Sequence, residues 1–214
     1  MAPDGALELL GVVAYGELAA FDRLAEDARM APDLADRVAV TAMAAIQYGH
    51  FRSAADRISE LGGDVVAMME PYRRAFDEFH ALTRPKSWYE GLLGVYIGDS
   101  LASDVYREVS DRSDDRTREL VHSVLDDEAY DAFVVDRVRA AIEADPEISG
   151  RLALWGRRMV GEALSQAQRV LAERPALAGL LTGASDGSLA EINRIMSRLI
   201  ENHSARMARL GLSA

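Results

Sequence analysis

The chain has 214 residues, 49% of them hydrophobic, which is enough to bury one sizeable core and predicts a single domain over residues 1–214. The absence of Cys excludes disulfides and zinc–thiolate sites, and the formal net charge of -11 disfavours non-specific binding to nucleic acid. No apolar run reaches membrane-spanning length and the N-terminus lacks the regions of a signal peptide, so we expect a cytoplasmic protein with no membrane partner.

Helical periodicity dominates the chain, and no run of alternating β-branched residues indicates a strand. An apolar stripe predicts a first helix over residues 4–28, and a second runs over 33–61 until Gly62-Gly63 stops it. Together they form a first hairpin over residues 1–63. Residues 64–87 then form a long crossover with one short helical piece, at 75–82.

A second hairpin is expected over residues 88–145, with helices at 88–110 and 115–144. A C-terminal pair follows over 146–214, with one helix from 146 to 174 and another from 189 to 210. Two hairpins joined by one long crossover are the topology of ferritin-like bundles. The fold prediction is therefore all-α: a ferritin-like four-helix bundle with two additional C-terminal helices.

Each hairpin carries polar residues on stripes that should be apolar. In the first hairpin these are Glu17 on one helix and Gln47 and His50 on the next. In the second hairpin they are Asp99 on one helix and Asp127 and Tyr130 on the next, at similar spacing. Buried carboxylates are costly unless a cationic partner meets them, so this repeated pattern predicts that the six side chains converge at the centre of the bundle.

The pattern resembles a known ligand set. A carboxylate on one helix and Glu-x-x-His on the next, used twice, binds two iron or manganese ions in carboxylate bundles. The i, i+3 spacing matters because it places a carboxylate and an imidazole on one helix face, one turn apart.

Several stretches extend the resemblance over most of the chain: Leu9–Leu18, Gly49–Arg52, Tyr96–Ser100, Ala140–Pro146 and Gly150–Arg158. On these residues the chain resembles the ferritin-like family that includes the bacterial hydroxylase of 2-methylthio-isopentenyl adenosine in tRNA, in a branch found in high-G+C bacteria. That resemblance implies a non-haem iron centre, with metal ligands at Glu17, Gln47, His50, Asp99, Asp127 and Tyr130. It also implies oxygen-dependent hydroxylation, with tRNA as a partner.

Two of these six positions depart from the ligand pattern. Gln47 stands where the Glu of Glu-x-x-His belongs, and Tyr130 stands where the His belongs. A neutral amide does not bridge two metal ions as a carboxylate does, and a phenol with a pKa of about 10 is a weak ligand. We therefore expect one iron ion rather than two, bound by Glu17, His50 and Asp127 with Asp99 nearby, and a metal-free centre is the alternative.

The sequence thus predicts a degraded or single-metal centre that acts on or binds a small organic substrate in the bundle core. The expected catalytic residues are Glu17, His50, Asp127 and Tyr130. A metal-independent acid–base pair, a di-iron tRNA hydroxylase and a metal-free scaffold protein remain as alternatives, and a homodimer is left open.

Other polar residues are expected to lie outside the site. His80 and His203 have no acidic partner at ligand spacing and are interpreted as surface or structural residues, and Gln166 is expected to be exposed. The C-terminal arginines Arg194, Arg198, Arg206 and Arg209 are interpreted as a solvated face, with a local basic patch as the alternative.

Overall fold

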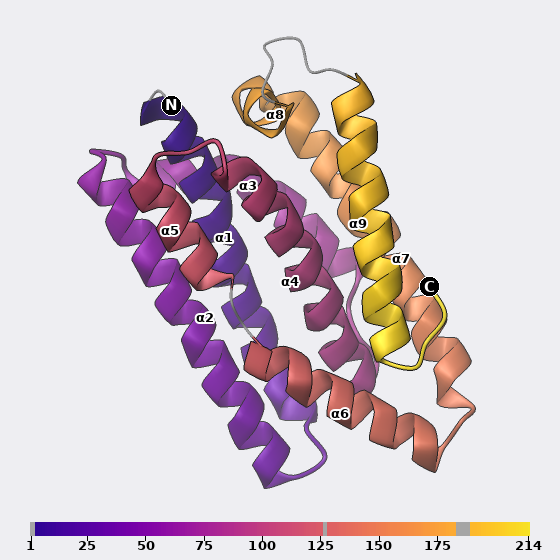
Figure 1. Ribbon diagram of the computed structural model, residues 1–214. Helices are drawn as coiled ribbons and strands as arrows, with labels where there is room; N and C mark the ends of the chain where they lie inside the picture. Colours follow the sequence, from indigo (N-terminus) through magenta and orange to yellow (C-terminus); the bar gives the residue numbers. More distant parts are fainter. Residues whose placement is uncertain (1–2, 126–127, 183–188) are drawn as a thin grey trace.

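The computed structural model describes residues 3–125, 128–182 and 189–214, and every regular element in these ranges is helical (Figure 1). This confirms the all-α prediction. In chain order the elements are α1 (Pro3–Asp27), the short 3-10 helix η1 (Ala28–Met30), α2 (Leu34–Glu60), α3 (Val65–Leu82), α4 (Trp88–Ser110), α5 (Asp115–Val124), α6 (Glu128–Ala144), α7 (Ile148–Glu173), α8 (Pro175–Thr182) and α9 (Leu189–Arg209).

Side-chain caps set the starts of several helices. Asp33, Asp64, Ser87 and Asp114 precede α2, α3, α4 and α5, and each accepts a hydrogen bond from the backbone N–H three residues later. Such caps satisfy amide groups that the first turn leaves without partners. Gly62, with φ of +79°, ends α2 as predicted, because a left-handed residue without a Cβ costs little there.

Most of the other helices pack lengthwise against α1 or α4, which lie side by side at the centre (Figure 1). α1 and α2 form the first hairpin, α4 packs on α1, and α5 lies against α4 and α2. On the other side of α1 and α4, α3 and α7 pack against each other. Figure 1 shows α6 crossing the lower end of the bundle and α9 running beside α7 and α4.

The predicted crossover is wrong in detail, because it forms a complete helix. α3 spans 18 residues and includes Pro71. The Tyr72 hydroxyl donates to Glu8 Oε2 at 2.6 Å, and Arg174 after α7 also pairs with Glu8. These contacts hold α3 between α1 and α7, so tertiary packing extends a helix that the local pattern indicated only in part.

The predicted single helix over 115–144 is also wrong, because α5 ends at Val124 and α6 begins at Glu128. Arg107 of α4 donates to the Leu125 carbonyl at 2.8 Å, which satisfies an acceptor beyond the end of α5. α6 then packs across the start of α4 and is joined to α2 by the Arg137–Asp36 ion pair. Neither contact can be read from local periodicity.

The C-terminal region contains one more helix than predicted. Pro175 ends α7, as expected, but it also starts α8. Proline suits the first position of a helix, since its fixed φ matches helical geometry and the N–H that it lacks has no intrahelical acceptor there.

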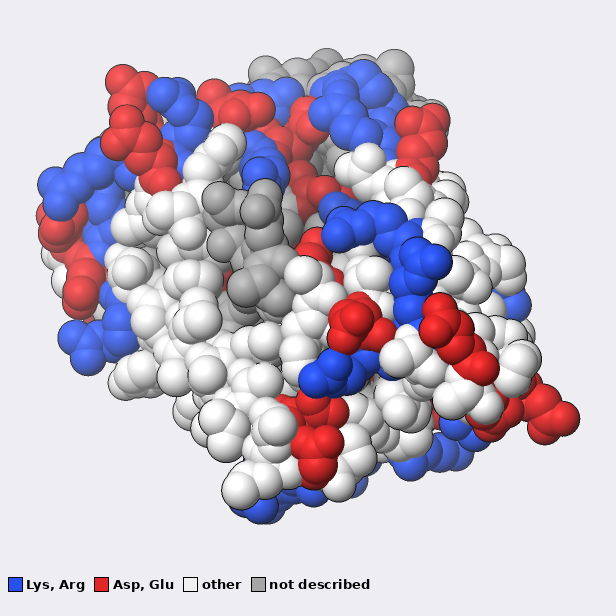
Figure 2. Space-filling model, turned by 60° about the horizontal axis from the view of Figure 1, so that its bottom comes forward, with Lys and Arg blue, Asp and Glu red and all other residues white. Residues whose placement is uncertain are grey.

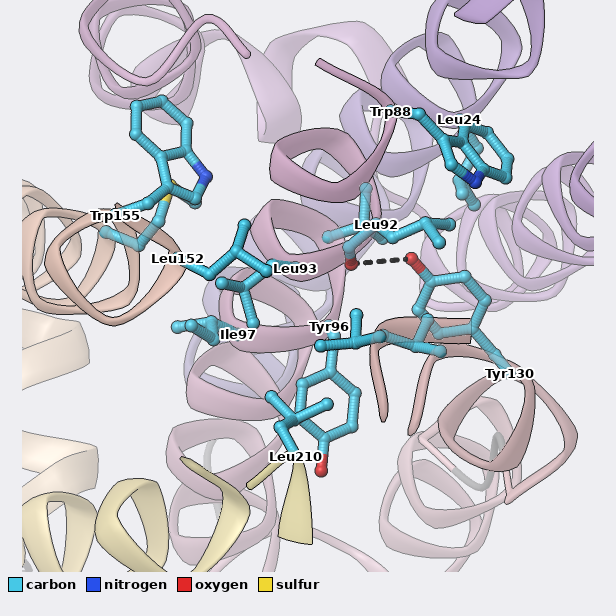
Figure 3. Close-up of a cluster of buried hydrophobic side chains, with 14 of the residues drawn as sticks. Leu24, Trp88, Leu92, Leu93, Tyr96, Ile97, Tyr130, Leu152, Trp155 and Leu210 are labelled. Atoms are coloured by element: carbon cyan, nitrogen blue, oxygen red, sulfur yellow. Dashed lines mark hydrogen bonds between the residues drawn. The ribbon is translucent and has the colours of Figure 1, made fainter. Parts of the chain in front are cut away.

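The apolar core is divided into two clusters along the length of the bundle. An upper cluster lies near the start of α1 and includes Leu10, Ile58, Tyr72, Val109 and Val121. A lower cluster lies near the start of α4, where α6 and α7 also meet (Figure 3), and includes Leu24, Val40, Leu92, Val138 and Leu152. Both clusters contain residues of α1, α2 and α4, so these three helices connect them.

Gly11 permits the close approach of α1 and α3. A Cβ at this position would lie 2.4 Å from the Met68 backbone oxygen, which no side-chain movement can relieve. We expect Gly11→Ala to lower the free energy of unfolding by about 2–4 kcal/mol, measured by urea denaturation.

Gly161→Ala is the matched control, because a Cβ there meets nothing within 4 Å on the same kind of helix. It is expected to raise stability by about 0.5–1 kcal/mol, the intrinsic helix preference of Ala over Gly. Equal effects of the two substitutions would contradict a tight α1–α3 contact.

Candidate functional site

Three of the predicted residues meet where α1 packs on α2. His50 Nδ1 lies 3.4 Å from Glu17 Oε2 and 3.4 Å from Gln47 Oε1. Glu17 and Gln47 are 7% and 5% exposed, whereas 18% of the His50 side-chain surface is exposed. The imidazole therefore stands between a buried carboxylate and solvent, with the amide of Gln47 beside it.

Asp99 of α4 lines the same cavity as Glu17 and Gln47. We call Glu17, Gln47, His50 and Asp99 the polar belt. Glu17 on α1 and Gln47 and His50 on α2 lie between the residues of the upper and lower clusters, and Asp99 lies between Ile97 and Leu101 of the lower cluster on α4. On α1, for example, Ala14 belongs to the upper cluster and Leu24 to the lower one. Of the predicted convergence, the structure brings Glu17, Gln47 and His50 into contact and places Asp99 on the wall of the same cavity.

Tyr106 of α4 adds a hydroxyl to the wall of the same cavity. It is buried and donates to the Val12 carbonyl at 3.3 Å. Burial raises the pKa of Tyr106 strongly, and the nearby charges of Glu17 and Asp99 raise it further, so the phenol stays protonated. Gly16 makes room for it, since a Cβ there would lie 2.7 Å from the Tyr106 oxygen.

Tyr130 lies in the lower cluster. Its hydroxyl donates to the Leu92 carbonyl at 3.2 Å, as Figure 3 shows. Leu92 precedes Asp99 by two turns of α4, or roughly 10 Å along the helix axis. The Tyr130 hydroxyl thus bonds α4 about two helical turns away from the level of Asp99. Asp127, the sixth predicted residue, lies outside the described residues.

The described donors do not fit a two-iron centre. Gln47 is neutral and faces His50, and the Tyr130 hydroxyl bonds a backbone carbonyl. In residues 3–125, 128–182 and 189–214, no three His, Asp or Glu side chains are grouped as a metal-ligand set. What these helices provide is one carboxylate–imidazole pair and a second carboxylate, Asp99, on the same cavity wall.

The cavity has a volume of about 630 Å³ and runs between α1, α3, α4 and α7. Its walls are mostly apolar, and small residues create much of its space, among them Ala20, Gly94, Gly98, Ala163 and Ala167. At Gly98 a Cβ would touch only the Phe79 ring, at 3.8 Å, so this position faces open space. A cavity of this size can hold a small organic molecule.

A buried ion pair lies at the lower end of this cavity, and sequence reasoning missed it. Arg23 Nε donates to Asp27 Oδ2 at 3.1 Å, and Arg23 Nη2 donates to the Thr83 carbonyl at 3.2 Å. His80 and Thr83 of the α3 end line the cavity beside Arg23. The only sequence signal is the i, i+4 spacing of Arg23 and Asp27, which usually marks a solvated helix face.

The interpretation of Gln166 is wrong, and the structure shows the surroundings of His80 and His203. Gln166 was expected to be exposed, but it is buried and lines the cavity from α7. His80 also lines the cavity, and burial and the Arg23 charge lower its pKa to about 4. His203 is buried in α9, where neither ring nitrogen has a hydrogen bond within the described residues.

Within the described residues, none of the helices has the length and apolar composition needed to cross a membrane. A comparison with curated proteins gave no match. The chain does match a family model described as a ferritin-like domain of actinomycetes, over residues 3–184. This match covers most of the 214 residues, so the chain belongs to that ferritin-like family.

The buried Asp27 makes a testable contribution to pH-dependent stability. Burial raises its pKa to about 6 from an ordinary value of 3.8, even though Arg23 lowers it. A raised carboxyl pKa favours the folded state at low pH, and this stability is lost as the pH rises through about 6. Between pH 4 and pH 7 the wild type should lose about 2 kcal/mol relative to an Asp27→Asn variant, measured by urea denaturation at each pH.

The control is Glu26→Gln, which changes the exposed neighbour of Asp27. Its pH profile is expected to follow the wild type within about 0.5 kcal/mol. Parallel pH profiles for wild type and Asp27→Asn would show that Asp27 titrates normally in the folded protein.

Proposed function

We propose that this member of the actinomycete ferritin-like family binds a small, mostly apolar organic molecule in its central cavity and acts on it through Glu17. The carrying observation is that the Glu17 carboxylate lines the cavity while His50 stands 3.4 Å behind it. The cavity wall thus offers the Glu17 carboxylate to a ligand, and an imidazole supports that carboxylate from the solvent side.

The composition of the walls supports an organic ligand. Ligand sites are usually apolar, with a few polar groups that fix orientation, and occupy about 300–1,000 Å³. Here the polar groups include Glu17, Gln47 and Asp99 of the belt, and apolar residues such as Phe76 and Phe79 form part of the wall beside them. A purely structural core would instead fill this space with side chains.

In the proposed mechanism Glu17 accepts a proton or a hydrogen bond from a donor group on the ligand. His50 is a positioning residue, because it contacts Glu17 without lining the cavity. The protonated Tyr106 hydroxyl keeps the two carboxylates in a polar environment at the upper end. General acid–base work of this kind needs a donor and an acceptor within hydrogen-bond reach, and needs no second metal half-site.

A single iron ion is the alternative that the same residues suggest. Glu17, His50 and Asp99 would supply two carboxylates and one imidazole, and Asp127 would complete the set that the resemblance to the tRNA hydroxylase family implies. The iron would supply oxygen activation. The contact of His50 Nδ1 with Glu17 and Gln47 favours the metal-free proposal, because it already engages that nitrogen within the protein.

Hydroxylation of tRNA has weaker support, because the C-terminal arginines are paired with carboxylates. Arg194 and Arg198 both pair with Glu108, and Arg206 forms two bonds to Asp104. Figure 2 shows basic and acidic side chains interspersed over the face in view. Binding to a polyanion requires a basic surface whose charges remain available for phosphates.

The proposal predicts selective binding of a hydroxyl-bearing probe. We expect 2-naphthol to bind at one saturable site, and Glu17→Gln to weaken it about tenfold, since a bond to a charged acceptor is replaced by a neutral one. Binding of 2-methoxynaphthalene, which has no donor, should change less than about threefold. Intrinsic probe fluorescence measures both.

Gly98→Leu should abolish binding of both probes, because the new side chain fills the open space beside Phe79. The matched control is Gly161→Leu, whose side chain enters open space elsewhere on the surface of α7. If wild-type protein binds neither probe, or if Gly98→Leu binds them like the control, the cavity is not a ligand site.

The metal content separates the proposal from its alternative. Protein purified without chelators is expected to contain far less than one transition-metal ion per chain by elemental analysis. Gln47→Glu places a carboxylate beside His50 and Glu17, and should introduce cobalt(II) binding visible by absorption spectroscopy.

Gln166→Glu, which adds a carboxylate elsewhere on the cavity wall, is the control and should not bind cobalt. One ion per chain in the wild type, lost on His50→Ala, would replace the proposal with the single-iron site.

A further inference from the structure

The lower end of the cavity is built differently from the polar belt. The belt presents carboxylates, whereas the lower end presents the guanidinium of Arg23 together with His80 and Thr83. Arg23 is 9% exposed, so its charge is removed from bulk water. A buried cation on the wall of an apolar cavity is costly, and anionic or strongly accepting groups are the partners that reduce this cost.

Arg23 keeps donors that the protein does not use. Its Nε bonds Asp27 and its Nη2 bonds the Thr83 carbonyl, whereas its Nη1 has no hydrogen bond within the described residues. A guanidinium carries five N–H donors in a planar fork that suits a carboxylate. Asp27 is held on one edge of this fork, so part of the remainder is open to a ligand in the cavity.

Two other arginines, Arg107 and Arg206, also line the cavity. Arg206 donates from both Nη atoms to Asp104, and Arg107 donates to the Leu125 carbonyl. Arg107 likewise leaves its Nη1 without a hydrogen bond within the described residues, so what sets Arg23 apart is its place beside His80 and Thr83 at the lower end of the cavity.

The charges of the side chains at the lower end of the cavity suit a ligand group with one negative charge. His80 is neutral near pH 7, because burial and the neighbouring Arg23 lower its pKa to about 4, and it can contribute a hydrogen bond but no second positive charge. Burial raises the pKa of Asp27 to about 6, so its negative charge is the one most easily neutralised when another carboxylate approaches Arg23.

The distance between Glu17 in the belt and Arg23 at the lower end sets the length of a ligand that reaches both. Glu17, Ala20 and Arg23 follow one another at single-turn intervals on α1, and all three line the cavity. Six residues of helix correspond to roughly 9 Å. α3 runs parallel to α1, since Phe76 lies next to Gly16 and Thr83 next to Arg23, and Phe76 and Phe79 thus provide an apolar wall between the ends.

We infer that the ligand of this cavity is an amphipathic carboxylic acid whose carboxylate binds Arg23 Nη1 beside His80. Its apolar body extends past Ala20 and Phe79, and a donor group roughly 9 Å from the carboxylate reaches Glu17. This inference rests on the proposed function, because it names the chemical class of the molecule bound at the same cavity.

The probe 6-hydroxy-2-naphthoate tests it, because its hydroxyl and carboxylate stand at opposite ends of a rigid apolar ring. Wild-type protein is expected to bind it at least about tenfold more tightly than 2-naphthol, which lacks the carboxylate. Its methyl ester should bind no more tightly than 2-naphthol. Affinities are measured by fluorescence titration at pH 7.

Arg23→Gln combined with Asp27→Asn removes both charges of the buried pair together, and so avoids leaving an unpaired carboxylate. In this double variant the preference for the acid over 2-naphthol should fall to within about threefold, while 2-naphthol binding persists. Arg23→Lys should keep part of the preference. Arg73→Gln, an exposed arginine on α3, is the control and should keep all of it.

The outcomes separate the two proposals. If 2-naphthol binds but the acid gains nothing over it, or if the double variant keeps the full preference, the carboxylate site is wrong and the cavity proposal stands. If the wild type binds none of the probes, both are wrong. A preference that depends on Arg23 supports the carboxylate site.

Discussion

The constraint on which the rest of this structure depends is the burial of acidic and amide side chains at mid-height in a helical bundle. Glu17 and Gln47 are almost fully buried on α1 and α2, and Asp99 joins them from α4. Removing a carboxylate from water is expensive unless a partner meets it, so these residues require His50, the Tyr106 hydroxyl and a polar cavity close by. The belt explains why the apolar core is divided in two.

The helices beside the belt carry small residues where a well-packed bundle would carry large ones. Gly16 has no Cβ, so the Tyr106 hydroxyl can pack against it. Gly98 on α4 and Ala163 on α7 leave part of the cavity unfilled. Such under-packing costs stability. The two flanking clusters and contacts such as Tyr72 to Glu8 compensate, since they fix α1, α3 and α4 above and below the cavity. The cavity thus lies between two packed apolar clusters, an arrangement suited to binding a ligand.

The charges along the cavity are arranged by sign. Carboxylates occupy the middle and a guanidinium occupies the lower end, so a molecule that spans both experiences an oriented environment. This polarity follows from α1 alone, which supplies both Glu17 and Arg23. At the lower end the Tyr130 hydroxyl joins α6 to the Leu92 carbonyl of α4 within the lower cluster.

The sequence by itself determined the helical class, the start and end of α1 and α2, and the presence of polar residues on apolar stripes, because caps, glycine stops and periodicity act over a few residues. It indicated a ferritin-like bundle, and it placed Gln47 and Tyr130 where the metal-ligand pattern of carboxylate bundles has Glu and His. The tertiary structure decided what local patterns do not contain. The break between α5 and α6 depends on Arg107 reaching Leu125, and the length of α3 depends on contacts with α1 and α7. The roles of Arg23 and Gln166 depend on which helix face meets the cavity. Such contacts join residues that are far apart in the chain. The spacing of neighbouring residues therefore does not predict them.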